Sequence, residues 1–397
     1  MRFNTILSFL ATAGLAASTP LSPILQAANI VNIANVIPNQ WIVVMKDISD
    51  SSFQSFLASR DASIISSTKA IHNIGTFKAF SGTFSQTLVN LLLSKAEVAY
   101  IEPDVKVSIN ALSTQSTARP WGLGRISHRK KGSTDFVYES SAGVGTYSYV
   151  IDTGVLTTHV EFEGRATFGV NFAGDGLNTD GNGHGTHVAG TIGSRAYGVA
   201  KKTNIIDVKV LDSKGAGALS NVILGIEWAV KDMESNGRKG KALANLSIGT
   251  AYSQATNDAV KAAVGRGLFI AVAAGNNGGD AALYSPGSEA TACTVGASDA
   301  NDVKAAYSNY GTVVDIFAPG SQIMSTWIRS NTDSYTQSGT SMSTPHIVGL
   351  AACLISLEGA KAPGPLCERM KTLSTKDVLT GGSGASVNYL AYNGNGA

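Results

Sequence analysis

Three short motifs supply an aspartate, a histidine and a serine at the ends of predicted strands or the starts of predicted helices. Asp152 follows the apolar run YSYVI, His184 lies in GNGHGTH, and Ser341 lies in GTSMSTPH before a long apolar segment. A serine hydroxyl becomes nucleophilic when an imidazole takes its proton, and the imidazole needs a carboxylate to fix its tautomer and stabilise its cation. Together these residues predict a hydrolytic triad.

The segment AVAAGNNGGD adds Asn276 after another predicted strand, where its amide is suited to donate to an oxyanion. Taken singly, each signal has a plainer interpretation: turn residues for Asp152 and Asn276, an N-cap for Ser341, and helix-start residues or a zinc pair for His184 and His187. Zinc is poorly supported, because no Glu follows the first histidine and no third ligand is evident. The occurrence of all four residues in one chain favours catalysis.

Beyond Pro120, short apolar runs alternate with amphipathic segments. The expected strands are almost continuously apolar, which is typical of parallel strands covered on both faces; they span 147–151, 205–211, 243–248, 268–274 and 294–297. One expected helix has Ser220 as its N-cap, and another spans 258–264. The alternation predicts an α/β fold with a doubly wound, mostly parallel sheet and helices on both faces. Ligands of such sheets collect beyond the carboxyl ends of the strands.

The N-terminal third is predicted to hold two further segments. Residues 1–19 read as a secretory signal peptide, because a basic start precedes an apolar run that ends in small residues. Residues 36–110 read as a small α+β unit in the order strand, helix, strand, strand, helix, strand, with Ser85 as the N-cap of its second helix. The polar stretch 111–118 resembles a linker or cleavage region, and the remaining domain is assigned to 111–397.

Composition excludes several classes of protein. Of 397 residues, 44% are apolar and 15% are charged, so the chain can bury a large core and is too apolar to be disordered. The net charge of +2 is scattered, with no basic block to neutralise phosphates, so nucleic acid is not an expected partner. No apolar stretch after the leader is expected to reach the length of a spanning helix, so we expect a secreted protein without a membrane anchor. Three cysteines in an oxidising compartment allow one disulfide and leave one thiol.

The motifs resemble, in order and over nearly the whole chain, the subtilisin-like serine proteases and among them the proteinase K subfamily of secreted fungal enzymes. The chain order Asp, His, Ser is also the subtilisin order. The matching segments are AYIEPD, PWGLGRIS, YVIDTGV, THVEFEGRA, GHGTHVAGTIG, VKVLDSKGAG, NLSIG, VAAGNN, SNYGTVVDIFAPG and GTSMSTPHIVGL.

The resemblance implies roles for individual residues of a serine endopeptidase acting on proteins and peptides. Asp152 orients His184, His184 is the general base and acid, Ser341 is the nucleophile, and Asn276 donates to the oxyanion. Segments 215–219 and 246–249 are implied to clamp an extended substrate, and the first pocket is walled by 247–249 and 273–275. The implied substrate-binding residues are Gly215, Gly217, Leu219, Leu246, Ser247, Ile248, Gly249, Ala273, Ala274, Gly275 and Thr340.

Maturation and stabilising features are implied as well. Residues 36–110 become a propeptide that assists folding and inhibits the enzyme until it is cut near Asn110-Ala111, and the mature enzyme is expected to be a monomer. The family's paired positions match Cys293 and Cys367, which leaves Cys353 free. Structural calcium is expected at the carbonyls of Ala290 and Ala292 and the carboxylate of Asp315. Asp175-Gly176 and Asp180-Gly181 could suggest another cation loop, but turn chemistry explains them.

Three competing functions are less consistent with the sequence. An α/β-hydrolase lipase needs Gly two residues after the nucleophile, where Ser343 stands, and its triad has another chain order. An inactive binding protein with this fold would be expected to lack a triad residue or Asn276. A dinucleotide site is disfavoured because Gly143 and Gly145 precede a strand, whereas a phosphate cradle follows one.

Overall fold

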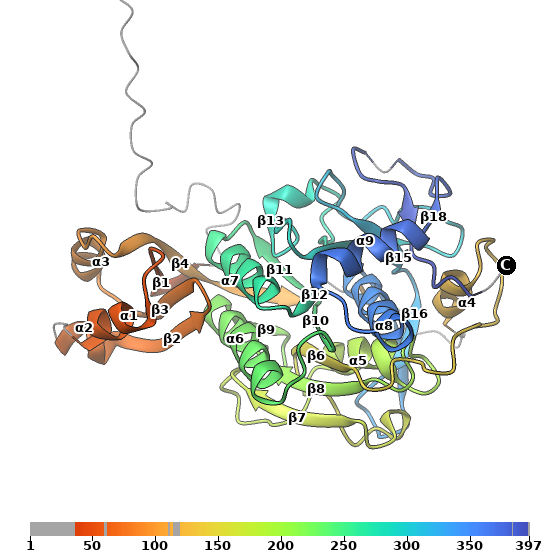
Figure 1. Cartoon of the computed structure of the whole chain (residues 1–397), viewed down its shortest axis with the longest axis horizontal. Helices are drawn as coiled ribbons and strands as arrows, with labels where there is room; N and C mark the ends of the chain where they lie inside the picture. Colours follow the sequence, from red (N-terminus) through yellow and green to blue (C-terminus); the bar gives the residue numbers. More distant parts are fainter. Residues whose placement is uncertain (1–35, 59–61, 110–111, 114–119, 383, 396–397) are drawn as a thin grey trace, which may run out of the picture.

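The computed structural model describes residues 36–58, 62–109, 112–113, 120–382 and 384–395. The predicted signal peptide and the bond 110–111 lie outside these residues. The described chain forms a small N-terminal unit and a larger α/β domain, which lie side by side (Figure 1).

The N-terminal unit is a four-stranded antiparallel sheet with helices on one face. Its strand order is β4-β1-β3-β2. The predicted element order is found, with one additional short helix, α2, and Ser85 caps α3 by accepting from Leu88 N. The elements are β1 (Val36–Met45), α1 (Asp50–Ala58), α2 (Ala62–Ser67), β2 (Thr68–Ile74), β3 (Phe77–Thr83), α3 (Gln86–Leu93) and β4 (Val98–Ile109).

The large domain is built on a nine-stranded, mostly parallel sheet, as predicted. Its strand order is β18-β19-β15-β14-β12-β10-β6-β8-β7, and only the pair β18–β19 is antiparallel. The strands are β6 (Tyr147–Asp152), β7 (Ala166–Asn171), β8 (Asn204–Lys209), β10 (Ala242–Leu246), β12 (Phe269–Ala273), β14 (Cys293–Ser298), β15 (Ile316–Pro319), β18 (Thr375–Lys376) and β19 (Tyr389–Leu390). Three further strands of this domain, β9 (Ala216–Ala218), β11 (Ile248–Ala251) and β13 (Tyr284–Ser285), extend the sheet of the N-terminal unit through β4 to seven strands. A separate three-stranded sheet is formed by β5 (Leu112–Ser113), β16 (Ile323–Thr326) and β17 (Ser334–Ser338).

Helices bury both faces of the central sheet. One face packs against α6 (Leu219–Ser235) and α7 (Gln254–Gly265), and the other packs against α5 (His184–Gly193) and α8 (Thr340–Glu358). Side chains of β6 divide accordingly: Tyr149 and Ile151 join the first core, and Val150 joins the second. This alternation is what a parallel strand covered on both faces requires. The remaining α-helices are α4 (Trp121–Ser127) and α9 (Pro363–Leu373).

Two sequence expectations need correction. Ser220 does not cap α6, because the helix begins at Leu219; instead the hydroxyl of Ser220 donates to Asp104 of the N-terminal unit at 2.7 Å. The expectation that no later apolar stretch reaches spanning length is wrong for α8, which is long and apolar enough to cross a bilayer. In the structure 83% of that stretch is buried inside the protein, as in the core helix of a soluble domain.

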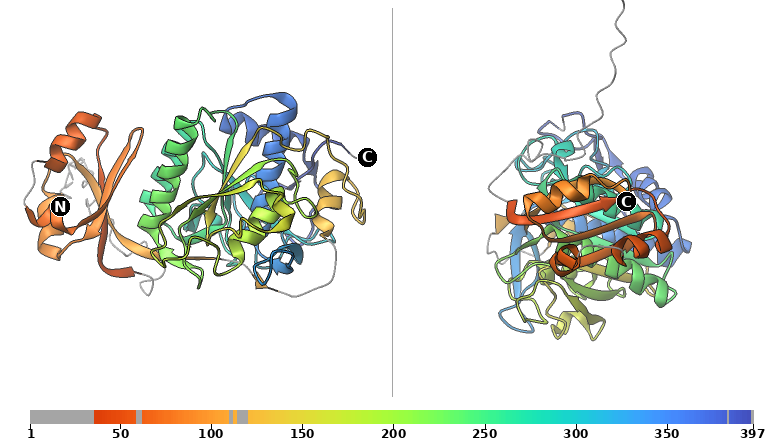
Figure 2. Two further views of the ribbon diagram at one scale, coloured as in Figure 1. Left: turned by 90° about the horizontal axis from the view of Figure 1, so that it is seen from below. Right: turned by 90° about the vertical axis from the view of Figure 1, so that its left-hand side faces the viewer.

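The N-terminal unit docks on α6 and α7 through the open face of its sheet (Figure 2, left). Ile42, Val44, Ile74 and Phe77 are buried there in one apolar cluster with residues of the large domain. The opposite face of the sheet packs on the unit's own helices in a separate cluster. The unit therefore has its own core and a second apolar surface, which the large domain covers.

Candidate active site

Asp152 and His184 form a buried pair at the carboxyl edge of the sheet. β6 ends at Asp152, and His184 is the first residue of α5. Nδ1 of His184 lies 2.7 Å from Oδ1 of Asp152, and the same oxygen accepts from Thr153 N. Both side chains are fully buried. With its Nδ1–H held by the carboxylate, the imidazole presents Nε2 as a proton acceptor.

A second carboxylate, Asp180, fixes the loop that delivers His184. Its Oδ1 accepts from Thr153 Oγ1, Asn182 N and Gly183 N, and its Oδ2 accepts from the backbone N–H and hydroxyl of Thr186, all within 3.0 Å. These donors belong to the turn after β6 and to the start of α5. Asp180 therefore ties together the two segments that carry Asp152 and His184. Sequence reasoning assigned it only to a turn.

Ser341 stands in the first turn of α8, as predicted. Its hydroxyl donates to the carbonyl of Ser247 at 3.0 Å, while the hydroxyl of Ser247 donates to the carbonyl of Ser341 at 2.8 Å. The Ser341 carbonyl is free to accept because the helical donor four residues on would be Pro345, which has no N–H. Among the described residues, Nε2 of His184 has no hydrogen-bond partner. In this arrangement the Ser341 hydroxyl is bound to Ser247, and no hydrogen bond joins it to the imidazole.

Asn276 is oriented by the residue that precedes the serine. Its Oδ1 accepts from both the backbone N–H and the hydroxyl of Thr340, each at 2.9 Å. The amide nitrogen Nδ2 then points away from Thr340, and it is buried without a partner within the described part of the chain. An amide N–H held in this way, beside the first turn of α8, is an arrangement suited to stabilising an oxyanion.

The two predicted clamp segments are filled by the protein's own chain. β4 pairs antiparallel with β9 through Lys106–Ala218 and Ser108–Ala216, and with β11 through Ser108–Gly249 and Ile109–Ile248. Further along the chain, Leu112 pairs with Ser338 of β17, three residues before Ser341. Ile109 therefore lies beside the strand that follows Ser247, and Leu112 lies beside β17, the strand that precedes Ser341.

The residues implied to wall the first pocket lie at the ends of neighbouring strands. β10 and β12 are parallel and in register up to Leu246 and Val272, so the segments 247–249 and 273–275 follow side by side. Gly275 has φ of 102° and its N–H donates to Thr340 Oγ1, which fixes this wall against α8. Leu219, another of the implied substrate-binding residues, is the first residue of α6 and is buried.

The other nearby histidines are structural. Nε2 of His187 contacts the carbonyls of Ile323 and Tyr335, and burial lowers the pKa of His187 to about 3. Nδ1 of His346 lies 2.8 Å from the Met342 carbonyl, and burial lowers its pKa to about 4. Both stay neutral at physiological pH.

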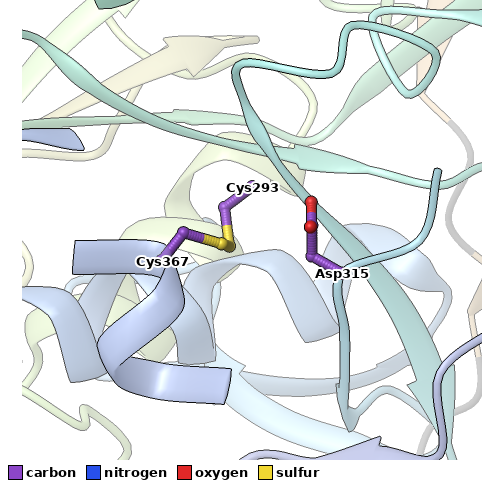
Figure 3. A group of neighbouring side chains, drawn as sticks. All are labelled: Cys293, Asp315 and Cys367. Carbon is purple, nitrogen blue, oxygen red and sulfur yellow. A yellow bond between two sulfur atoms is a disulfide. The ribbon is translucent and has the colours of Figure 1, made fainter. Parts of the chain in front are cut away.

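The predicted disulfide between Cys293 and Cys367 is present, and Cys353 is free. Asp315 lies beside the disulfide (Figure 3), and these three residues form the one group of metal-binding residue types found in the described chain. Because the two cysteines are bonded to each other, the carboxylate of Asp315 is the one side chain of this group that remains able to bind a metal ion. Its Oδ2 accepts from Thr294 N, and its Oδ1 lies 3.3 Å from the ammonium of Lys371. Calcium takes six to eight oxygens, so the residues fit calcium only if Lys371 moves away.

Comparison with known proteins agrees with this geometry. The sequence profile of the subtilase family, Peptidase_S8, matches residues 145–381. A cuticle-degrading protease of Metarhizium anisopliae is 52% identical over 318 residues, covering 80% of this chain and 81% of the relative. Alkaline serine protease ver112 of Corniculantispora psalliotae is 46% identical over 99% of this chain and 100% of the relative. Among solved structures, a cold adapted subtilisin-like serine proteinase is similar, with a TM-score of 0.65 and 39% identity over 69% of this chain and 98% of that one.

Proposed function

Because the chain belongs to the subtilase family and is a subtilisin-like serine endopeptidase, we propose that it cleaves peptide bonds through an acyl-enzyme at Ser341. The observation that carries the proposal is the buried Asp152–His184 pair, whose Nε2 has no partner among the described residues. Asp152 ends β6, and the Ser341 hydroxyl binds Ser247, which directly follows β10, the strand paired with β6. No second function is favoured by any feature of the site.

In the proposed mechanism, Nε2 of His184 takes the proton of the Ser341 hydroxyl as the oxygen attacks the substrate carbonyl. Asp152 stabilises the resulting imidazolium. The developing oxyanion accepts from Nδ2 of Asn276 and from the backbone N–H of Ser341 at the start of α8. His184 then gives the proton to the leaving amine, and a water molecule, deprotonated by the same nitrogen, hydrolyses the ester.

We propose that residues 36–110 are an inhibitory propeptide and that the enzyme itself cuts near Asn110-Ala111. Two contacts support this: β4 fills the clamp between β9 and β11 up to Ile109, and Leu112 pairs with β17 on the far side of Ser341. The two residues between these contacts hold the bond assigned to cleavage. Antiparallel pairing of this kind supplies affinity through main-chain hydrogen bonds that depend little on sequence.

Broad specificity follows from the same clamp. The segments 247–249 and 273–275 carry no charged side chain, so we propose that the first pocket prefers apolar and aromatic residues before the cut bond. We also propose that the enzyme is secreted, acts as a monomer without a membrane anchor, and can hold structural calcium at Asp315 and the carbonyls of Ala290 and Ala292.

The mechanism is tested by treating the mature protein with a serine-directed phosphonylating reagent and mapping the modified residue. We expect label on Ser341 alone. Ser343→Ala is the matched control, because Ser343 lies in the same turn of α8 but its hydroxyl donates to the Ala318 carbonyl. Ser341→Ala should lower turnover by about a million-fold, the loss found when this serine is removed from a subtilisin. Label on another residue, or normal turnover by Ser341→Ala, would contradict the mechanism.

A further inference from the structure

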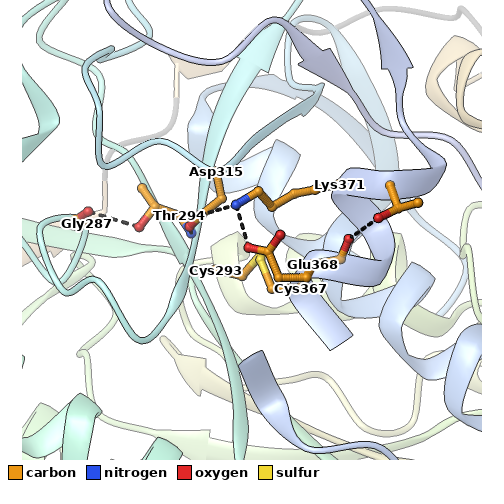
Figure 4. The surroundings of a disulfide bond; sticks show 8 residues. Gly287, Cys293, Thr294, Asp315, Cys367, Glu368 and Lys371 are labelled. Carbon is orange, nitrogen blue, oxygen red and sulfur yellow. Dashed lines mark hydrogen bonds and ion pairs between the residues drawn. A yellow bond between two sulfur atoms is a disulfide. The ribbon is translucent and has the colours of Figure 1, made fainter. Parts of the chain in front are cut away.

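We propose that Lys371 is a tethered cation that takes the place of calcium at Asp315, so that a metal ion binds there only by displacing the lysine. This inference rests on the proposed calcium site, and it states what controls calcium binding there. In Figure 4 the ammonium of Lys371 lies between the carboxylates of Asp315 and Glu368.

The carboxylate of Asp315 is held in place by the strand beside it. Thr294 N donates to Oδ2 at 2.9 Å, and Thr294 O accepts from the backbone N–H of Asp315 at 2.9 Å. These two bonds leave Oδ1 as the oxygen that faces outward. Lys371 Nζ lies 3.3 Å from Oδ1 and 2.6 Å from Oε1 of Glu368. The only strong anion of the implied calcium site therefore already has a positive partner.

The disulfide determines where this ammonium can be. Cys367 and Lys371 are four residues apart on α9, so they lie on the same face of the helix one turn apart. Cys293 directly precedes Thr294 on β14, and the bridge thus holds α9 against the strand that fixes Asp315. The Lys371 side chain is mostly buried, with 20% of its surface exposed. Lys371 is therefore built into the site and is not a freely moving surface lysine.

Calcium and the ammonium would compete for the same oxygen. A bound calcium ion needs Oδ1 or both carboxylate oxygens at 2.3–2.6 Å, and two cations this close to one carboxylate repel each other. Lys371 must swing out before calcium enters, which lowers the apparent affinity by the fraction of time that the site is free. Without calcium, the lysine supplies the charge that a buried carboxylate requires.

The test measures calcium binding and thermal unfolding in the full chain carrying Ser341→Ala, which prevents self-digestion. The probe is calcium chloride, titrated calorimetrically against protein stripped with a chelator. Lys371→Met removes the charge and keeps the length of the side chain. We expect the parent protein to unfold at the same temperature with chelator and with millimolar calcium. Lys371→Met should unfold at a lower temperature with chelator, recover with calcium, and bind calcium at least about tenfold more tightly than the parent.

Two further variants control the measurement. Lys361→Met removes a lysine of similar exposure that pairs with Glu358 instead, and it should behave like the parent. Lys371→Arg keeps a cation and should stay insensitive to calcium, which keeps the test usable if Lys371→Met folds poorly. Equal calcium binding by parent and Lys371→Met would preserve the calcium site and overturn the competition. No calcium binding by either protein would overturn both.

Discussion

Glu102 of the N-terminal unit accepts a hydrogen bond from the hydroxyl of Ser253, the residue that caps α7. Its second oxygen accepts from Ala255 N in the first turn of the same helix. Two residues further along β4, Asp104 binds Ser220 at the start of α6 in the same way. Oxygen acceptors at helix N-termini satisfy N–H groups that have no partner within the helix. The N-terminal unit is thus attached through two helix ends as well as through its apolar face.

This attachment predicts that the N-terminal unit is released more readily as pH rises. Burial raises the pKa of Glu102 from 4.5 to about 7, against the hydrogen bonds from Ser253 and Ala255, and nearby Asp258 and Asp104 raise it further. A group whose pKa is raised in the docked state stabilises docking fully below pH 4.5 and loses that contribution as pH rises through about 7. The docking equilibrium should therefore weaken by about two orders of magnitude across this interval.

If the proposed self-cleavage occurs, the measurement is the time course with which activity then appears, followed between pH 5 and pH 8. Activation should be slow at pH 5 and fast at pH 8. Glu102→Gln has the same shape without the titrating carboxylate, so its activation should depend much less on pH. The control is Glu97→Gln, an exposed carboxylate of the same unit. A pH dependence that is unchanged in Glu102→Gln would contradict the assignment to this residue.

Asp180 is predicted to position His184 for catalysis. Asp180→Asn replaces one acceptor oxygen by an NH₂ group, which faces N–H donors of the loop and leaves at least one of them unsatisfied. We expect kcat to fall by about 10- to 100-fold, because a small displacement of a catalytic group costs that much, while KM changes little. Asp299→Asn is a matched control, since Asp299 also collects two backbone N–H groups but in a loop away from His184. If KM rises and kcat does not fall, Asp180 does not act through His184.

The sequence was most informative where a residue's role follows from its own strand or helix. Asp152, His184 and Ser341 each stand at the end of a strand or the start of a helix, and parallel strands bring such ends to one edge of the sheet. The apolar runs that predicted the strands match β6, β8, β10, β12 and β14 to within a few residues. The Asp-Gly turn at Asp180 was recognised, but its five donors come from two segments whose approach only the folded chain reveals.

Contacts between distant segments were the part that sequence patterns could not supply. Lys371 and Asp315 are 56 residues apart, and they meet because the disulfide holds α9 against β14. Ser220 looked like an N-cap because it precedes an amphipathic run, yet its hydroxyl donates a hydrogen bond to Asp104, 116 residues away in the sequence. Local propensity cannot separate a residue that caps its own helix from one that binds another unit.

The proposed oxyanion role of Asn276 predicts a loss in turnover with little loss in binding. Asn276→Ala removes Nδ2, and the rate should fall by about 100- to 1,000-fold, as it does when the corresponding donor is removed from a subtilisin. KM should be nearly unchanged, because the donor acts on charge that develops in the transition state. Asn277→Ala is the neighbouring control. Steady-state kinetics on one peptide substrate separates the two effects, and a rise in KM alone would argue against an oxyanion donor.

The disulfide is predicted to be a major source of stability. The bridge closes a segment with a sequence separation of 74 residues, which corresponds to roughly 4 to 5 kcal/mol in the chain-entropy model. Replacing both Cys293 and Cys367 by Ala in the Ser341→Ala background should lower the free energy of unfolding in urea by about that amount. Cys353→Ala breaks no bridge and should cost much less. Similar losses in the two proteins would mean that the bridge constrains the unfolded chain very little.

The proposed first pocket carries no charged side chain, and this predicts which bonds are cut. Ser247 to Gly249 and Ala273 to Gly275 are small or polar except for Ile248, so a basic side chain entering this pocket would find no partner for its charge. An unpaired buried charge is costly, whereas an apolar or aromatic side chain gains from leaving water, by about 1 to 3 kcal/mol. Because main-chain pairing with β9 and β11 does not depend on the side chains of the substrate, the preference should be broad.

Profiling a peptide library with the mature enzyme should therefore show cleavage after many apolar and aromatic residues. A strict requirement for Lys or Arg in the unmodified enzyme would refute this account of the pocket.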